Sequence, residues 1–221
     1  MSARRPSYYP LFADLTGRAC VVIGGGIVAQ RKVAMLLRCG AQVTVVSPSV
    51  TRRLRVMTRS GHVVRRARRF RPADLRGAWL AIAATDNPAT NQAVSRTAGR
   101  RRIFVNVVDE TPLCTFIAPA IATRGLATVA VSTGGGSPAL AKRLRDEVRR
   151  ILDNGYAPML GLLAGLRPSA KRRLSGAAAR KRYFEALVEG EAFGLVRQGR
   201  RRRARQVALA LLVRHAARNG G

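Results

Sequence analysis

Apolar runs and amphipathic segments alternate along the first half of the chain. Five short apolar runs predict β-strands, at 19–23, 42–46, 62–64, 79–84 and 103–107. The segments between them carry apolar residues on one helical face and predict helices, at 28–39, 50–59 and 88–98. Strands that alternate with helices form a parallel sheet with right-handed crossovers and helices on both faces. The pattern therefore predicts a doubly wound α/β domain that ends near Asp109.

The pattern changes beyond this domain. Two further strands are predicted at 115–119 and 126–132, and a glycine run then leads into a helix at 138–152. From Asn154 onward the chain is helical in propensity and rich in basic residues. We therefore expect a smaller α+β unit after the first domain, followed by a helical C-terminal tail.

A glycine-rich turn follows the first strand directly. Gly24, Gly26 and Ala29 fit the pattern G-x-G-x-x-A, at the point where a strand ends and a helix begins. Gly24 permits the tight turn, and Gly26 lets backbone amides approach a pyrophosphate without a Cβ in the way. The first helical residues, Ile27 and Val28, share the partial positive charge of the helix N-terminus. We predict that this turn binds a dinucleotide; a glycine-rich turn without a ligand is the alternative.

The end of the second strand bears on which dinucleotide fits. An acidic side chain usually stands there and binds the adenosine ribose of NAD, but this chain has Ser47, Pro48 and Ser49. Either serine could form a hydrogen bond with the ribose. Arg52 and Arg53 follow closely and could accommodate the 2′-phosphate of NADP. The residues alone therefore leave the choice between NAD and NADP open.

Polar residues also mark the fourth and fifth strands, whose carboxyl ends border the predicted ligand crevice. Thr85 and Asp86 end the fourth strand, where they could bound the cofactor or cap the helix that begins at Pro88. Asn106 lies in the fifth strand, and Asp109 lies at its carboxyl end. A carboxylate at this edge can serve as a general base, and an ordinary turn residue is the alternative.

The charge of the chain is extreme. It carries 41 basic and 11 acidic residues, a formal net charge of +30, and only four of the basic residues are lysine. An arginine excess suits a polyanionic ligand, but it also arises from codon usage in a GC-rich genome, so charge alone names no partner. A basic, NAD-responsive regulator that binds nucleic acid is the second class of protein to consider. Nucleic acid is not expected as a partner, because only 5% of residues are aromatic and no recognition motif is present.

The sequence lacks the patterns that would indicate secretion, a membrane span or a metal site. The N-terminal segment up to Leu15 has no signal-peptide core, and no apolar run approaches ~18 residues, so we expect a cytoplasmic protein without a membrane span. The three cysteines lack C-x-x-C spacing, which indicates neither a disulfide framework nor a cysteine metal site. His62 and His215 are isolated, so no dedicated metal site is expected.

Four segments together resemble one protein family. They are 24–32, 83–86, 106–109 and 131–138, in this order along the chain. With them the chain is similar to the precorrin-2 dehydrogenase and sirohydrochlorin ferrochelatase family, which includes the N-terminal module of bifunctional siroheme synthases. The similarity extends from about Tyr8 to Leu152 and is looser beyond.

The resemblance implies a fold, an activity and an assembly. The fold is a Rossmann-type NAD-binding domain at 1–110, a smaller α+β dimerisation and substrate domain at 111–152, and a helical, basic C-terminal region at 153–221.

The activity is that of an oxidoreductase acting on a CH–CH bond: the NAD-dependent oxidation of precorrin-2 to sirohydrochlorin, in siroheme or cobalamin biosynthesis. The assembly is a homodimer. Some members are also ferrochelatases, which are lyases that take Fe²⁺ as a substrate. Because the sequence ends at Gly221, no methyltransferase domain is expected.

The resemblance also implies roles for single residues. The family's functional aspartate corresponds to Asp109, which would take a proton from the tetrapyrrole as hydride leaves. The substrate is a polycarboxylate, so arginines such as Arg124, Arg143 or Arg145 are candidates to bind it. A serine that is phosphorylated in at least one member is Thr133 here, which leaves its modification open. The predicted cofactor contacts are Gly24, Gly26, Ile27, Val28, Ser47, Pro48, Ser49 and Thr85. The predicted substrate contacts are Asn106, Ser132, Thr133, Gly134, Gly135 and Ser137.

Several questions stay open at the level of sequence. Family members differ in whether they insert iron or cobalt although they share these motifs, so the motifs decide neither the chelatase activity nor its metal. A generic NAD(P) enzyme with another acidic substrate is a third alternative, and the four segments together argue against it. No motif indicates the role of the basic C-terminal region.

Overall fold

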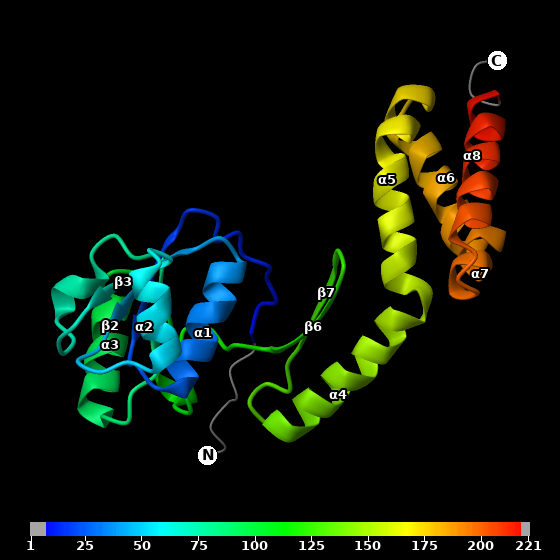
Figure 1. Ribbon diagram of the computed structural model, residues 1–221. Helices are drawn as coiled ribbons and strands as arrows, with labels where there is room; N and C mark the ends of the chain where they lie inside the picture. The colour runs from blue at the N-terminus through cyan, green and yellow to red at the C-terminus, as the bar shows by residue number, and fades with distance from the viewer. Residues whose placement is uncertain (1–7, 218–221) are drawn as a thin grey trace. The chain divides into compact units, whose positions relative to one another are not determined.

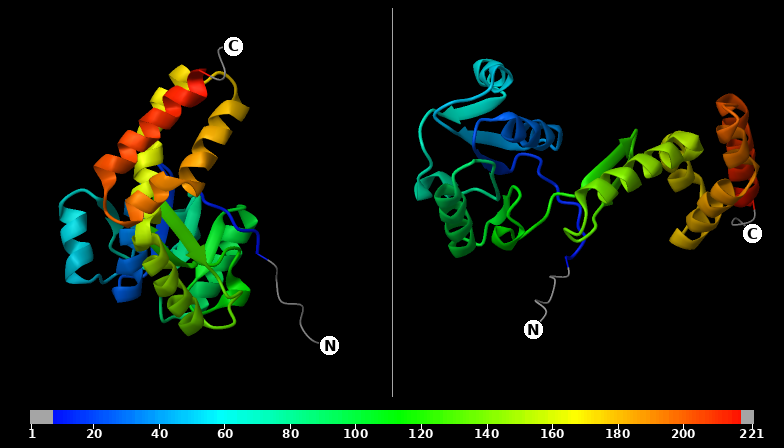
Figure 2. Two further views of the ribbon diagram at one scale, coloured as in Figure 1. Left: turned by 90° about the vertical axis from the view of Figure 1, so that its right-hand side faces the viewer. Right: turned by 90° about the horizontal axis from the view of Figure 1, so that it is seen from below.

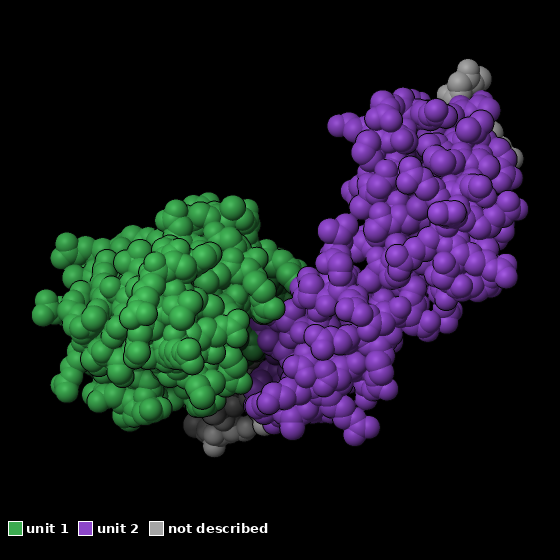
Figure 3. Space-filling model, in the orientation of Figure 1, with its two compact units in different colours: residues 1–118 green, residues 119–221 purple. Residues whose placement is uncertain are grey.

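The computed structural model describes residues 8–217, so the first seven residues of the N-terminal segment lie outside the described part of the chain. The chain forms two compact units, of which the first ends at Ala118 and the second begins at Pro119 (Figure 3). Among the described residues, no helix has both the length and the apolar character that crossing a membrane requires.

A sheet of five parallel strands forms the centre of the first unit, in the order β3-β2-β1-β4-β5. The strands are β1 (Ala19–Ile23), β2 (Gln42–Val46), β3 (Val63–Arg66), β4 (Leu80–Ala83) and β5 (Phe104–Val107). β1 pairs with β2 on one side and with β4 on the other. The direction of winding reverses at β1, which puts the ligand crevice of such a sheet outside the carboxyl end of β1. The predicted doubly wound sheet is confirmed.

Helices cover both faces of this sheet (Figures 1 and 2). They are α1 (Ile27–Arg38), α2 (Arg52–Arg59), α3 (Pro88–Arg100) and the short helix η1 (Pro72–Leu75). α1 and α2 pack on one face, and α3 and η1 pack on the other. Ala29, Val33 and Leu36 recur at helical spacing on α1 and are buried against the strands. Burying an aliphatic side chain such as Val33 stabilises the fold by roughly 1.5–3 kcal/mol, and this contact fixes the start of α1 at the carboxyl end of β1.

The strand predicted at 115–119 is not formed, and the first unit extends beyond the predicted boundary at 110. A short helix, η2 (Thr111–Leu113), follows β5. The chain then turns back along β5, where the Thr115 amide donates to the Val105 carbonyl at 2.8 Å and the Thr115 hydroxyl accepts from the Val105 amide at 2.8 Å. β5 is an edge strand, whose free backbone groups need partners. The apolar segment after η2 covers that edge and therefore belongs to the first unit.

The second unit begins with a hairpin. β6 (Ala120–Arg124) and β7 (Ala127–Val131) are antiparallel, and α4 (Pro138–Ile151) packs against them (Figure 2). A single irregular turn, η3 (Leu152–Tyr156), ends α4, because Asn154 and Gly155 leave the helical conformation. Gly155 has φ +97°, and a Cβ on it would lie 2.5 Å from Cγ of Arg197. The break therefore requires glycine at this position.

The remaining helices form a bundle with a core of its own. They are α5 (Ala157–Arg173), α6 (Ala177–Glu189), α7 (Glu191–Arg197) and α8 (Arg201–Ala217). Leu166, Leu187 and Leu212 come from three of these helices and are almost fully buried together. Tyr183 is also buried, and its hydroxyl donates to the Ala208 carbonyl at 3.0 Å. The helical propensity of this region is confirmed, but the region is a packed bundle and not a tail.

Candidate functional site

Three consecutive glycines follow β1, and each has a different environment. Gly24 has φ +119°, and a Cβ on it would lie 2.0 Å from the Ala84 carbonyl oxygen. A Cβ on Gly25 would lie 1.9 Å from the Ser49 carbonyl oxygen. Gly26 is exposed, and a Cβ there would meet nothing within 4 Å. The first two glycines are therefore required by the chain's own backbone, whereas the third leaves space in front of α1.

The start of α1 has free backbone amides. Gly26 is its N-cap and provides no side-chain hydrogen bond, whereas α2 is capped by the Thr51 hydroxyl at 3.2 Å and α3 by the Asn87 side chain at 2.8 Å. Ile27 is 68% exposed. Unsatisfied amides, the helix dipole and an open approach at Gly26 together suit an anion such as a pyrophosphate. The residues present therefore fit a dinucleotide.

The turn after β2 packs directly against the glycine turn. The Thr51 amide donates to the Gly25 carbonyl at 2.9 Å, which ties the two turns together. Ser47 is buried, and its hydroxyl donates to the Ser49 carbonyl at 2.6 Å. Pro48 and Ser49 are exposed. Of the two serines considered for the ribose, Ser47 therefore shapes the turn, and Ser49 is the one accessible from outside.

Arg65, which the sequence analysis did not single out, also belongs to this turn. It lies on β3, and its Nη2 donates to the Pro48 carbonyl at 2.7 Å and to the Ser47 carbonyl at 3.3 Å. The signal that could have found it is the strand order, since β3 is the neighbour of β2. A basic residue near the end of β3 therefore lies beside the residues that end β2.

The carboxyl ends of β4 and β5 are joined by a side chain that the sequence analysis also missed. Asn91 is buried in α3, and its Nδ2 donates to the Thr85 carbonyl at 3.1 Å and to Oε1 of Glu110 at 3.0 Å. The Thr85 hydroxyl donates to Oδ1 of Asn91 at 2.9 Å. Because Asn87 caps α3, neither Thr85 nor Asp86 has that role. Thr85 lies beside the glycine turn, with its Cγ2 3.5 Å from where a Cβ on Gly24 would lie.

Asp109 lies in a tight turn directly after β5. It is exposed and has φ +61°, a left-handed conformation that costs a non-glycine residue of order 1 kcal/mol and recurs at functional sites. Burial lowers the pKa of Lys32 on α1, and Arg31 lowers it further, whereas Asp109 and Cys114 act in the opposite direction. A half-buried ammonium group therefore lies within electrostatic reach of the Asp109 carboxylate.

Asn106 and Cys114 tie the segment after η2 to β5. Asn106 is buried, and its Nδ2 donates to the Phe116 carbonyl at 3.2 Å and, more weakly, to Sγ of Cys114 at 3.6 Å. The Val107 amide donates to the same sulfur at 3.1 Å. Burial raises the pKa of the Cys114 thiol, so this cysteine serves as a neutral hydrogen-bonding group. Asn106 therefore holds the segment after η2 in place, and its predicted contact with substrate stays a prediction.

The remaining predicted substrate contacts lie in the loop between β7 and α4, in the second unit. The Ser137 amide donates to the Thr133 hydroxyl at 3.1 Å, and the Gly134 amide donates to the Ser132 hydroxyl at 3.1 Å. The Ser137 hydroxyl caps α4 by accepting from the Leu140 amide at 3.1 Å. Gly134 and Gly135 are exposed. The loop is thus closed by its own hydroxyl groups. It belongs to a different compact unit from Gly24 and Asp109.

The three arginines considered for substrate carboxylates are already paired. Arg145 makes a bidentate pair with Asp146 at 2.9 Å, and Arg143 contacts Glu147 at 3.3 Å. Arg124 pairs with Asp153. Each partner belongs to the second unit, as do the arginines themselves. A substrate carboxylate would have to compete with these acids, which are half-exposed and therefore hold their partners only weakly.

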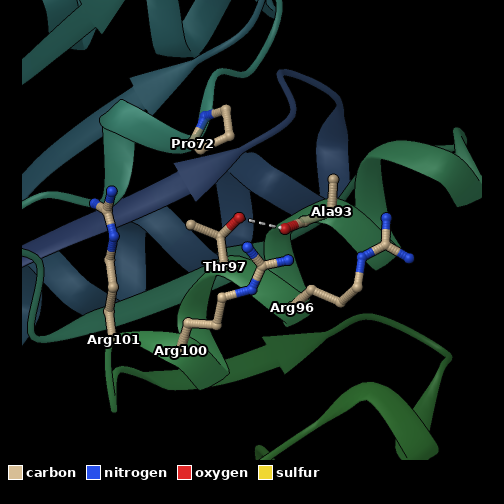
Figure 4. A pocket seen from close by; sticks show the side chains of 6 residues that line it. All are labelled: Pro72, Ala93, Arg96, Thr97, Arg100 and Arg101. Atoms are coloured by element: carbon tan, nitrogen blue, oxygen red, sulfur yellow. Dashed lines mark hydrogen bonds between the residues drawn. The ribbon is translucent and has the colours of Figure 1, made fainter.

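A cavity of about 310 Å³ opens on the α3 side of the first unit (Figure 4). Its lining residues are Pro72, Ala93, Arg96, Thr97, Arg100 and Arg101. Because α3 runs back from the end of β4 to the start of β5, its last residues lie at the amino edge of the sheet. None of the predicted site residues lines this cavity. Within 8–217, no cluster of three histidine, cysteine or acidic side chains is arranged to hold a metal ion.

A glycine turn at the carboxyl edge of a doubly wound parallel sheet, opening onto an uncapped helix, defines a dinucleotide-binding protein of the Rossmann class. Three family models match the chain in succession. They are described as "Putative NAD(P)-binding" at 11–120, "Sirohaem biosynthesis protein central" at 128–151 and "Sirohaem synthase dimerisation region" at 155–212. The chain belongs to the siroheme synthase family and corresponds to its N-terminal module.

Known proteins agree with this membership. The siroheme synthase of Nitrosospira multiformis is 44% identical over 188 residues, which are 83% of this chain and 40% of that protein. The siroheme synthase of Sodalis glossinidius is 38% identical over 97% of this chain and 45% of its own length. The chain thus spans less than half the length of these relatives.

A solved structure named "SirC, precorrin-2 dehydrogenase" has the same fold. It superposes with a TM-score of 0.76 at 24% identity, over 92% of this chain and 100% of that one. The comparisons give no support to a nucleic-acid-binding regulator. The description that names dimerisation falls on 155–212, whereas the sequence analysis placed this role at 111–152.

Proposed function

We propose that this chain is a precorrin-2 dehydrogenase that oxidises precorrin-2 to sirohydrochlorin with NAD⁺, in siroheme or cobalamin biosynthesis. The observation that carries the proposal is the open, uncapped start of α1 in the same unit as the exposed Asp109 turn, in a chain of this family. Bound NAD⁺ would accept a hydride from the tetrapyrrole. Everything else that the reaction needs must come from side chains and backbone groups of the protein.

The cofactor contacts divide into binding and positioning groups. The amides of Ile27 and Val28 would hold the pyrophosphate, with Gly26 leaving room for it. Ser49 would reach the ribose from the exposed turn after β2, and Ser47 and Pro48 would shape that turn. Thr85 would border the cofactor, held in place by Asn91.

Asp109 is proposed as the general base. Oxidation of a CH–CH bond removes a hydride and a proton, and the Asp109 carboxylate would accept the proton. Its turn has φ +61° and is bordered by Cys114, whose sulfur donates to the Glu110 carbonyl, and Lys32 supplies a positive charge nearby. The loop at 132–137 is proposed to bind a carboxylate of the tetrapyrrole through its backbone and the start of α4.

We further propose a homodimer in the cytoplasm, built through the second unit. The helical bundle carries the dimerisation description, and it exposes large apolar side chains such as Val188, Leu209 and Val213. Such side chains are costly to leave in water and are commonly covered at interfaces. Sedimentation of the purified chain tests this: a monomer at micromolar concentration would contradict it.

Ferrochelatase activity is the second candidate function. The observation that favours it is again Asp109, because a carboxylate that accepts a proton during oxidation could also accept pyrrole protons when Fe²⁺ enters as a substrate. The tetrapyrrole nitrogens would then be the metal ligands. Anaerobic incubation of sirohydrochlorin with Fe²⁺ or Co²⁺ tests this activity and its metal, through the change in the absorption spectrum.

The decisive assay for the main proposal is anaerobic. Purified chain is mixed with precorrin-2 and NAD⁺, and the formation of NADH and sirohydrochlorin is followed by absorbance. We expect turnover by the wild-type chain and its loss in Asp109→Asn with dinucleotide binding retained. A chain that neither binds NAD⁺ nor reduces it with precorrin-2 would refute the proposed function.

A further inference from the structure

The turn that carries Asp109 is held at both of its ends by one side chain. The turn runs from Val107 to Glu110 and is closed by the Glu110 amide, which donates to the Val107 carbonyl at 3.3 Å. Sγ of Cys114 accepts from the Val107 amide at 3.1 Å. The same thiol lies within donating distance of two carbonyl oxygens, that of Val107 at 3.2 Å and that of Glu110 at 3.4 Å. Asp109 therefore lies between the two residues whose backbones this sulfur contacts.

The conformation of Asp109 needs such support. Its φ of +61° is a left-handed conformation, which is costly for any residue other than glycine and persists only where the surrounding structure holds it. Because Asp109 is exposed, its direction is set by the backbone of the turn and not by packing around the side chain. Burial raises the pKa of the Cys114 thiol, which therefore keeps its proton at neutral pH and can donate to the turn.

We propose that Cys114 is a positioning residue for the oxidation, because its thiol holds the turn in the conformation that presents the Asp109 carboxylate to the tetrapyrrole. The inference rests on the proposed role of Asp109 as general base and adds the group that fixes the direction of that base. A general base must lie within hydrogen-bond reach of the proton that it removes. Misplacement of a catalytic group by about 1 Å can lower a rate by about 10²-fold.

Asn91 is a second side chain that bonds to this turn. Its Nδ2 donates to Oε1 of Glu110 at 3.0 Å, so it reaches the turn through a side chain with several rotatable bonds. Cys114, in contrast, contacts backbone atoms of the turn directly. Asn91 also donates to the carbonyl of Thr85, a predicted cofactor contact, at 3.1 Å. Loss of Asn91 should therefore weaken dinucleotide binding, whereas loss of the Cys114 thiol should lower kcat alone.

The test compares two replacements of Cys114 that have nearly the same volume. Cys114→Ala removes every side-chain hydrogen bond, whereas Cys114→Ser keeps a hydroxyl that both donates and accepts. In the anaerobic assay with precorrin-2, Cys114→Ala should lower kcat by about tenfold to a hundredfold and change the dissociation constant of NAD⁺ by less than about twofold. Cys114→Ser should keep kcat within about fivefold of the wild type.

The matched control is Cys20→Ala, which removes a buried thiol from β1, in the same unit, without touching the turn. It should keep kcat within about twofold of the wild type even if it lowers the stability of the fold. The unfolding transition of every variant is measured beside its kinetics. A loss of kcat that merely follows a loss of stability would appear in Cys20→Ala as well and would contradict the inference.

A double variant tests whether Cys114 acts through Asp109. In an Asp109→Asn background, Cys114→Ala should lower kcat further by less than about twofold, because the group that the thiol positions is already disabled. If the two losses multiply instead, Cys114 acts on another part of the reaction and the inference is overturned.

Other outcomes would also overturn it. Cys114→Ala with the kcat of the wild type does so, as does Cys114→Ser that is as slow as Cys114→Ala. If Asn91→Ala lowers kcat with NAD⁺ binding retained and Cys114→Ala does not, the role belongs to Asn91. Where Cys114→Ala does not fold, Cys114→Val and Cys114→Thr repeat the comparison, because they share a shape and differ in a hydroxyl. A wild-type chain that does not oxidise precorrin-2 refutes the proposed function as well, whereas the failures above leave it intact.

Discussion

Replacing Gly26 by alanine separates the needs of the ligand from the needs of the fold. Gly26 has φ −76° and ψ −173°, an extended conformation that alanine adopts without strain. The added Cβ would meet no protein atom within 4 Å. Alanine is a poorer N-cap than glycine but reduces the freedom of the unfolded chain, and these effects oppose each other. The free energy of unfolding should therefore change by less than about 1 kcal/mol.

Dinucleotide binding should respond very differently. The Cβ would lie in the space in front of α1, where the pyrophosphate must approach the amides of Ile27 and Val28. Displacing the anion from one such amide forfeits a charge-assisted hydrogen bond of roughly 1.5–3 kcal/mol. The dissociation constant of NAD⁺ should therefore rise by about tenfold to a hundredfold.

The measurements are chemical unfolding and calorimetric titration, with Gly24→Ala as the contrasting variant. At Gly24 a Cβ would lie 2.0 Å from the Ala84 carbonyl oxygen at φ +119°, so this variant should lose several kcal/mol of stability by overpacking and strain. Gly26→Ala should lose affinity and keep its stability. If it binds NAD⁺ as tightly as the wild type, the pyrophosphate does not lie in front of α1 and the assignment of the site fails.

Three further predictions follow from single residues. Asp109→Asn should lower kcat by about 10²–10⁴-fold without changing the dissociation constant of NAD⁺; unchanged turnover would remove the base. Burial opposes ionisation of Asp74, but hydrogen bonds from Arg68, the Arg71 amide and Arg66 outweigh it and lower its pKa. Asp74→Asn should therefore cost about 2–3 kcal/mol of unfolding free energy above pH ~5, and this cost should shrink below pH ~4, where the wild type loses the same contribution. A cost independent of pH, or one matched by the exposed control Asp86→Asn, would contradict this. Gly155→Ala should cost about 1–3 kcal/mol in thermal or chemical unfolding, because its φ is +97° and Arg197 fills the space; an unaffected transition would show that the break tolerates a side chain.

Four of the five strands of the first unit are mostly buried apolar runs followed by a turn, which made them predictable; in β3 (Val63–Arg66) only Val63 is buried. The prediction that 115–119 is a strand of the second unit was wrong, although this segment is as apolar as the strands that were predicted correctly. Its backbone instead satisfies the free edge of β5, with Thr115 bonded to Val105 at 2.8 Å. A local pattern records that a segment is apolar and extended, but it does not record which neighbour covers it.

The C-terminal bundle shows the opposite difficulty. Its basic composition suggested a solvated tail, yet Leu166, Leu187 and Leu212 meet in a core, and Tyr183 finds a buried acceptor. Long arginine side chains lie on the outside of such helices and dominate the composition. Alanines such as Ala204 and Ala208 are fully buried and allow the helices to approach closely. Composition therefore described the surface of the bundle and concealed its core.

The glycine turn could be predicted because its chemistry lies within a few consecutive residues. Asn91 and Lys32 could not, because each acts on a residue far along the chain. Asn91 bonds to Glu110 through an α3 position that reads only as a helical polar residue. Lys32 lies within reach of Asp109 because α1 and the end of β5 border the same edge of the first unit. These two pairs of residues meet because of the order of the strands in the sheet, and the sequence pattern predicts the strands but not their full order.

The turn after β2 is another place where strand order brings distant residues together. The residues that follow Val46 in sequence include no acid at the end of β2, and the nearest arginines, Arg52 and Arg53, open α2. In the sheet, however, Val45 pairs with Arg65 and Val46 with Arg66, so the end of β3 lies beside the end of β2. Arg66 contacts Asp74, whereas Arg65 donates to the Pro48 carbonyl in the turn after β2. A basic side chain on the neighbouring strand therefore belongs to the turn after β2, although it lies 17 residues beyond Pro48 in sequence.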